Sequence, residues 1–149
     1  MNAIEGILSS IKDLAKRVGR LEVQDNPRWV YLAAPLTSTS FDGDSFSTTA
    51  KTVMDLSALF TVPAGIKAVL VTVTYRDSAS ATADCLLILS PNNSAGSGIE
   101  FRCWGQVNDF WSNGTGIIPC DANGDIYYQC FASGAGTLDI YIQIWGYLV

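Results

Sequence analysis

The sequence contains no histidine, the side chain that most often acts as a general base or binds a transition metal. Charged residues are also scarce, at 15 % of the chain, and the four cysteines form no C-x-x-C pair. A serine or cysteine nucleophile would lack its usual base, and the aspartates fall mostly in or beside segments that read as turns. We therefore expect no enzymatic activity, no catalytic residues, no metal site and no cofactor.

Positive charge is sparse beyond the N-terminal segment. Residues 29–149 carry four basic and ten acidic side chains, and an acidic surface repels the phosphates of nucleic acid. No apolar run approaches the roughly eighteen residues that a membrane span needs. Residues 1–24 also lack the continuous apolar core of a signal peptide. We expect a protein made in a cytoplasm, with neither nucleic acid nor membrane insertion among its interactions.

The cysteines are widely spaced along the chain. Cys85 and Cys103 share the alternation of neighbouring apolar residues, which predicts small buried side chains. A disulfide between Cys120 and Cys130 is the alternative.

The N-terminal segment does contain a seven-residue repeat of aliphatic residues. Three successive heptads have an aliphatic residue at every a and d position: Ile4, Ile7, Ile11, Leu14, Val18 and Leu21. Such a narrow, unbroken seam is typical of a coiled coil, and a helix packed on its own domain is the alternative. The mixture of isoleucine, valine and leucine does not by itself decide the number of strands.

The stretch RVGRLE, residues 17–22, favours three strands. Arg17 at position g, Val18 at a, Leu21 at d and Glu22 at e match a motif of short parallel trimeric coiled coils. In that motif the arginine reaches the glutamate of the next helix while its methylenes cover the apolar seam. Residues 1–25 are therefore predicted to trimerise, with Arg17 and Glu22 beside the six core residues.

After a linker at residues 26–28, the apolar spacing changes to a period of two, which predicts β-strands in a head domain over 29–149. The predicted strands are Trp29–Ala33, Phe46–Leu56 with an interruption, Ile66–Arg76, Ala83–Ser90, Gly98–Val107, Gly116–Pro119, Ile126–Ala132 and Thr137–Leu148. Long glycine-rich turns between such strands are typical of an antiparallel sandwich. The expected fold is mainly β, a jelly-roll-like β-sandwich preceded by the helix.

The strand at residues 66–76 is largely apolar on both faces. An antiparallel sheet in a monomer normally leaves one face in water, so we expect a neighbouring copy of the chain to cover the second face.

Aromatic and polar side chains gather in WGQVNDFWSNGTG, residues 104–116. Aromatic rings stack on sugar faces, and amides and carboxylates bond to hydroxyls, so this stretch is a candidate glycan site. The candidate ligand-binding residues are Trp104, Asn108, Asp109, Trp111 and Asn113. The alternative is that the two tryptophans fill the core or the trimer interface.

A short trimeric coil followed at once by a β-sandwich head resembles the tips of bacteriophage fibres and spikes, and trimeric phage head-decoration proteins. Residues 55–78, DLSALFTVPAGIKAVLVTVTYRDS, and 120–149, CDANGDIYYQCFASGAGTLDIYIQIWGYLV, resemble small phage-encoded heads. The resemblance implies a virion structural protein, made in the host cytoplasm and displayed on the virion surface as a homotrimeric fibre or decoration subunit. Its N-terminal coil would attach it to other virion proteins of the capsid or tail. The alternative is a receptor-binding tail-fibre tip that recognises a host cell-surface glycan.

Overall fold

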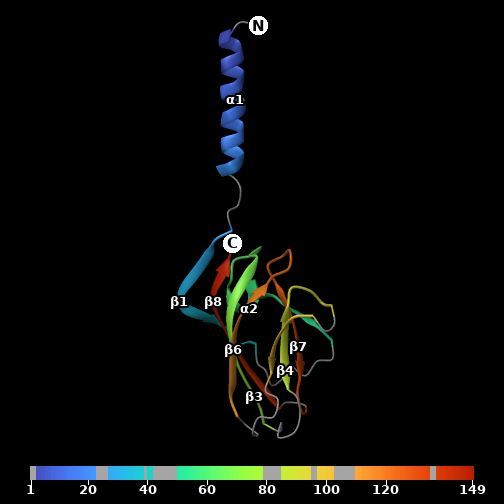
Figure 1. Ribbon diagram of the computed structural model, residues 1–149. Helices are drawn as coiled ribbons and strands as arrows, with labels where there is room; N and C mark the ends of the chain where they lie inside the picture. Colours follow the sequence, from blue (N-terminus) through green and yellow to red (C-terminus); the bar gives the residue numbers. More distant parts are fainter. Residues whose placement is uncertain are drawn as a thin grey trace.

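A computed structural model of the chain has one long N-terminal helix followed by a β-sandwich (Figure 1). The structure describes residues 3–22, 27–38, 40–41, 50–78, 85–94, 97–102, 110–134 and 137–149, and, within the long helix, the side chains of residues 4–17.

Helix α1, Ala3–Glu22, stands clear of the sandwich (Figure 1). At 1.5 Å per residue it is about 30 Å long. Its apolar residues recur three and four positions apart, which places them along one side of the helix. Within the described ranges, no helix has both the length and the apolar character needed to cross a membrane.

In the part of the chain that the structure describes, eight strands follow the helix, and each overlaps a strand predicted from the alternation of apolar residues. They are β1 (Trp29–Thr37), β2 (Thr52–Met54), β3 (Ala68–Asp77), β4 (Leu86–Ser90), β5 (Ile99–Arg102), β6 (Ser112–Pro119), β7 (Ile126–Phe131) and β8 (Leu138–Leu148).

The strands form two four-stranded antiparallel sheets, which confirms the predicted β-sandwich. The first sheet has the order β1-β8-β3-β6 and the second has the order β2-β7-β4-β5. Among these eight strands the chain changes sheet at every connection except β4 to β5. Strands that are far apart in the sequence are therefore direct neighbours.

The hydrophobic core lies between the sheets and is built from the inward row of each strand. In β3, Val69, Val71, Val73 and Tyr75 are buried, while Leu70, Thr72, Thr74 and Arg76 between them are half-buried. Strand β8 alternates in the same way, and the second sheet contributes buried residues of β4, β5 and β7. The period of two in the sequence is thus the alternation between core and outer face.

One segment that was predicted as a strand end forms a helix instead. Leu56 begins the short helix α2, Leu56–Phe60, because Asp55 caps its N-terminus. The Asp55 carboxylate accepts a hydrogen bond from the backbone N–H of Ala58 at 2.9 Å. Leu56 and Phe60, four residues apart, then bury their side chains in the core.

A second segment was predicted as a turn and is a strand. The sequence SNGTG begins β6 rather than preceding it, and the glycines are explained by packing. A Cβ atom on Gly114 would lie 2.7 Å from the ring of Phe101, which comes from β5 in the facing sheet. The glycines of β6 therefore make room for a buried aromatic ring.

The two ends of the sandwich differ in what they carry. The end nearer to α1, which we call the helix pole, contains the start of β1 and the end of β8 (Figure 1). Arg28 and Val149 exchange two backbone hydrogen bonds of 3.2 and 3.1 Å there, so these two strand ends lie side by side. The opposite end, the distal pole, is where β3 ends at Asp77 and where β6 and β8 begin.

Asp77 is a buried carboxylate that holds the distal pole together. It is only 1 % exposed. It accepts hydrogen bonds from the backbone N–H of Ser133 at 2.8 Å, from the Cys85 thiol at 3.1 Å and from the Thr137 hydroxyl at 3.3 Å. The Ser133 hydroxyl donates to it as well. One side chain thus joins the end of β3 to the segments that flank β4, β7 and β8.

Replacing Asp77 by alanine is expected to destabilise the sandwich by about 3 kcal/mol, because several buried donors lose their acceptor. The urea midpoint of unfolding, followed by circular dichroism, would fall accordingly. Asp77→Asn keeps one acceptor oxygen and should lose less. Equal stability of Asp77→Ala and the unaltered chain would contradict this role.

Candidate functional site

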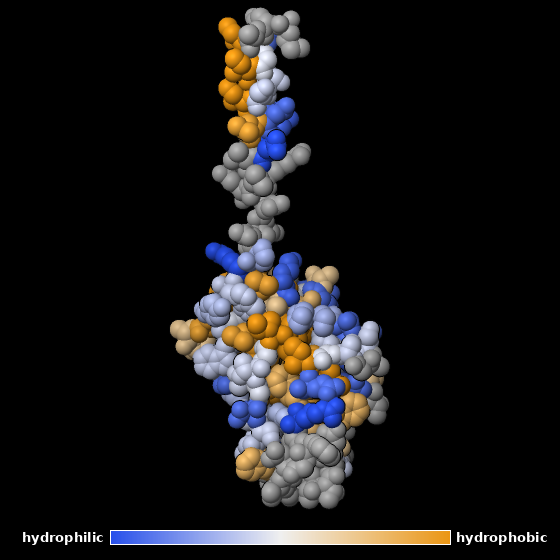
Figure 2. Space-filling model, viewed as in Figure 1, coloured by the Kyte–Doolittle hydropathy of each residue, from blue (hydrophilic) through white to orange (hydrophobic). Residues whose placement is uncertain are grey.

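The first candidate site is the apolar stripe of α1. Ile4, Ile7, Ile11 and Leu14 are between 57 and 67 % exposed, and Leu8 beside them is 52 % exposed. Figure 2 shows this stripe as a continuous hydrophobic band along one side of the helix. A soluble chain normally buries such a stripe, so the helix presents a surface suited to another helix.

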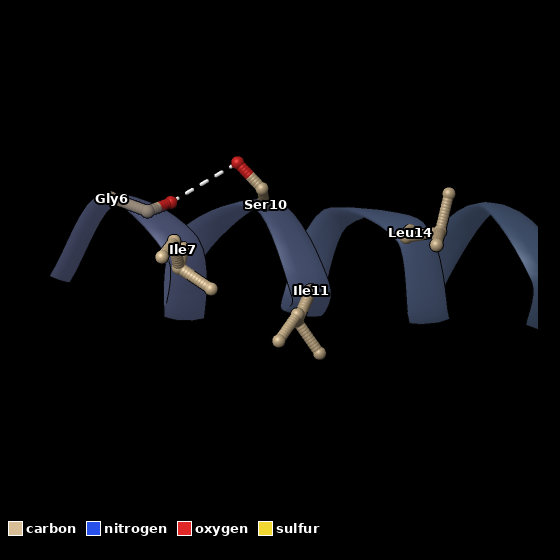
Figure 3. A pocket seen from close by; sticks show the side chains of 5 residues that line it. All are labelled: Gly6, Ile7, Ser10, Ile11 and Leu14. Carbon is tan, nitrogen blue, oxygen red and sulfur yellow. Dashed lines mark hydrogen bonds between the residues drawn. The ribbon is translucent and has the colours of Figure 1, made fainter. Parts of the chain in front are cut away.

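The middle of the stripe has the shape that coiled-coil packing requires. A shallow groove is lined by Gly6, Ile7, Ser10, Ile11 and Leu14 (Figure 3). The last four of these residues occupy positions i, i+3, i+4 and i+7, the four that surround one hole in knobs-into-holes packing. An aliphatic side chain of a facing helix would fill it.

Ser10 is the one polar member of that hole, and its hydroxyl is already bonded within the helix. The Ser10 hydroxyl donates to the Gly6 carbonyl oxygen at 3.1 Å (Figure 3). An apolar side chain can therefore lie against Ser10 without leaving an unpaired donor.

The second half of the predicted seam is described only in its backbone. Arg17 is exposed, and the helix continues without a break to Glu22. The side chains of Val18, Leu21 and Glu22 lie outside the described residues. The pairing of Arg17 with Glu22 of a neighbouring helix stays a prediction.

The second candidate site is the outer face of the first sheet at the distal pole. Trp111, directly before β6, is 46 % exposed, and the Arg76 guanidinium lies 4.6 Å from the centre of its ring. Arg76 also forms an ion pair with Asp139 of β8, its partner in the strand register. Three neighbouring strands thus contribute one aromatic ring and one ion pair to a single row.

A second row lies next to the first on the same face. Asn113 of β6 pairs in register with Thr74 of β3, which pairs in turn with Tyr141 of β8. Asn113 is exposed, and the Tyr141 side chain is 46 % exposed. The two rows together, which we call the distal platform, present two aromatic rings with amide, hydroxyl, guanidinium and carboxylate groups between them.

The structure brings together only part of the predicted ligand-binding set. Trp111 and Asn113 lie on the distal platform, whereas Trp104, Asn108 and Asp109 lie outside the described residues. For Trp111, the alternative of a core position is wrong, because the ring is exposed.

Sequence reasoning missed Arg76, Asp139 and Tyr141, which come from β3 and β8. The sequence did place all three at alternate, outward-facing positions of predicted strands. This alternation does not say which strands are neighbours, so it could not show that these residues lie close to Trp111.

The described residues contain no group of three or more histidine, cysteine, aspartate or glutamate side chains that could hold a metal ion. Cys120 and Cys130 are free thiols, so the alternative of a disulfide between them is wrong. Cys103 lies outside the described residues.

Two of these thiols are poorly suited to nucleophilic chemistry. Burial, together with the nearby carboxylates of Asp121 and Asp125, raises the pKa of Cys120 to about 12. Burial alone raises the pKa of Cys130 to about 12. Because the thiolate is the nucleophile, both groups are inert near neutral pH.

Comparison of the sequence with models of known protein families gave no match, and comparison with curated proteins gave none either.

The thiols of the folded protein are expected to resist alkylation. At pH 8, a thiol with a pKa of about 12 is ionised in about one molecule in ten thousand. A Cys103→Ser variant treated with iodoacetamide should stay unmodified by mass spectrometry when native and react fully in urea. Rapid labelling of the partly buried Cys120 in the native protein would contradict its raised pKa.

Proposed function

We propose that the protein is a homotrimeric bacteriophage virion surface protein, a fibre or decoration subunit whose coil anchors it to the particle. The observation that carries the proposal is the exposed aliphatic stripe of α1 on a helix that stands clear of its own sandwich. A helix of this kind covers its stripe by pairing with other copies.

Three parallel copies are favoured over two or over an antiparallel arrangement. In a parallel coil, position g of one helix faces position e of the next, which brings Arg17 close to Glu22. In an antiparallel pair, g faces g, and Arg17 would have no carboxylate opposite it. The charges therefore support parallel chains, and the match to the trimer motif supports three.

The sandwich is proposed to be a jelly roll. The strand pairs β1–β8, β2–β7, β3–β6 and β4–β5 support this topology, because they are the pairs of a long hairpin wound into two sheets. Double-sheet jelly rolls of eight strands are common in viral surface and capsid domains.

The head has an apolar region that would strengthen a trimer below the coil. Near the helix pole, Ile117 of β6 is 52 % exposed and pairs in register with the half-buried Leu70 of β3. Thr72 and Thr115 follow on the same face, and their hydroxyls are hydrogen-bonded at 3.2 Å. Covering these residues with a neighbouring head would bury apolar surface without leaving these hydroxyls unpaired.

A second function, recognition of a host cell-surface glycan by a fibre tip, is favoured by one observation. The exposed ring of Trp111 lies at the distal pole, which is the end of the head farthest from the proposed anchor. That end would face outward on a particle.

The purified chain is expected to have a mass of about 48 kDa by light scattering, three times the 16.0 kDa of one chain. Ile11→Asp would place three carboxylates in the apolar seam of the trimer. Burying such unpaired charges costs roughly several kcal/mol, so this variant should be a monomer.

Ser9→Asp is the matched control, because Ser9 is exposed at the outermost heptad position and the same carboxylate there leaves the seam intact. This variant should remain trimeric.

Arg17→Ala should weaken the trimer by about 0.5 kcal/mol for each lost pair. If the unaltered chain is a monomer at micromolar concentration, both the proposed trimer and the proposed anchoring role of the coil are refuted.

Immunogold electron microscopy of purified phage particles, with antibodies against the head domain, tests the location of the protein. Gold on the capsid surface is expected for a decoration or head-fibre subunit. Gold confined to the tail would favour the receptor-binding alternative. Particles that carry the protein by mass spectrometry but bind no gold at the surface would refute both.

A further inference from the structure

The distal platform combines exposed aromatic rings with a dense set of hydrogen-bonding groups. Trp111 and Tyr141 are each 46 % exposed on the outer face of the first sheet. Neighbouring strands are about 4.8 Å apart, so β6, β3 and β8 together give a flat strip about 10 Å wide. Polar side chains from all three strands lie on this strip.

We propose that the distal platform binds a neutral saccharide chain, with the sugar rings on Trp111 and Tyr141. This inference rests on the second function proposed above and gives it a site and a ligand class. The flat, apolar faces of sugar rings suit exposed aromatic rings, and sugar hydroxyls need donors and acceptors close to those rings.

The polar groups around the two rings supply both kinds of partner. The Asp139 carboxylate accepts hydrogen bonds, the Arg76 guanidinium donates them, and the Asn113 amide and Thr74 hydroxyl do either. Arg76 is held in place by Asp139 and by the ring of Trp111. A platform whose side chains are already fixed loses less conformational entropy when it binds a ligand.

The charge of the head selects a neutral ligand over an anionic one. Residues 29–149 carry four basic and ten acidic side chains, a net charge of −6. On the platform itself, the positive charge of Arg76 is balanced by Asp139. Sialylated or phosphorylated chains would meet a repulsive field without an unpaired cation to bind them.

The platform is better suited to a ligand than to a second head. The apolar residues of the same outer face, Leu70 and Ile117, lie toward the helix pole. The distal rows instead contain the Arg76–Asp139 ion pair, Thr74 and Asn113, and burying an ion pair between chains costs desolvation energy. Three heads joined near the coil would leave the distal platforms open to solution.

The experiment uses the full chain and immobilised oligosaccharides, with binding followed by biolayer interferometry. The neutral probes are hexose and N-acetylhexosamine oligomers, and the anionic probes are their sialylated and phosphorylated counterparts. We expect binding to at least one neutral probe, with less than a twofold change in affinity between low and high salt, because no net charge is involved.

Trp111→Ala and Tyr141→Ala are each expected to weaken binding about tenfold or more. Two variants on different strands keep the test valid if one of them fails to fold. Tyr31→Ala is the matched control, because Tyr31 is an exposed tyrosine of the same sheet that lies near the helix pole. Its affinity for the neutral probe should equal that of the unaltered chain.

Absence of binding to every neutral probe would overturn the inference, as would binding that Trp111→Ala and Tyr141→Ala leave unchanged. Salt-sensitive binding to the anionic probes alone would overturn the assignment of a neutral ligand. Light scattering on the same samples separates the proposals. Saccharide binding that both platform variants leave unchanged refutes only the platform, a trimer that binds no saccharide also refutes glycan recognition, and a monomer refutes the coil.

Discussion

The pairing of β8 with both β1 and β3 is the interaction on which the other features of the molecule depend. At the helix pole it brings Arg28 next to Val149, so the start of β1 lies beside the end of β8. At the distal pole the same strand places Asp139 beside Arg76, which in turn lies against Trp111. A shift of β8 by one residue would turn its inward isoleucines toward solvent and separate the ion pair. One register therefore sets both the strand pairing at the helix pole and the composition of the distal platform.

The two candidate surfaces differ in chemistry and lie at opposite ends of the molecule. The stripe of α1 is aliphatic and follows a heptad spacing, which suits identical helices. The distal platform is flat and mixed, with aromatic rings among hydrogen-bonding groups, which suits a polar ligand. Because the sandwich separates them, the proposed self-association through the helix and the proposed ligand binding at the distal pole would not compete for the same residues. The three heads of a trimer would also present three platforms, and several weak sites acting together bind a repetitive surface far more tightly than one does.

The sequence allowed the helix and the strands to be predicted because both leave local periodic patterns. The heptad of Ile4, Ile7, Ile11 and Leu14 and the alternation in β3 and β8 are readable without knowing any neighbour. The prediction was wrong where a distant residue decides the conformation. The SNGTG segment reads as a turn, but it is a strand paired with β3, and its Gly114 leaves room for the ring of Phe101. Only part of the distal platform was predicted for the same reason: Trp111 stands out in the sequence, whereas Arg76 and Asp139 meet through a pairing that links positions 63 residues apart.

The central position of β8 also bears on the order of events during translation. Helix α1 needs only its own residues, and helices form within about a microsecond. Strand β8 leaves the ribosome more than a hundred residues later, roughly ten seconds at usual rates of synthesis. Until then β1 and β3 lack the strand that lies between them in the finished sheet. We therefore expect nascent chains on neighbouring ribosomes of one messenger to meet through their helices while their heads are still unfolded.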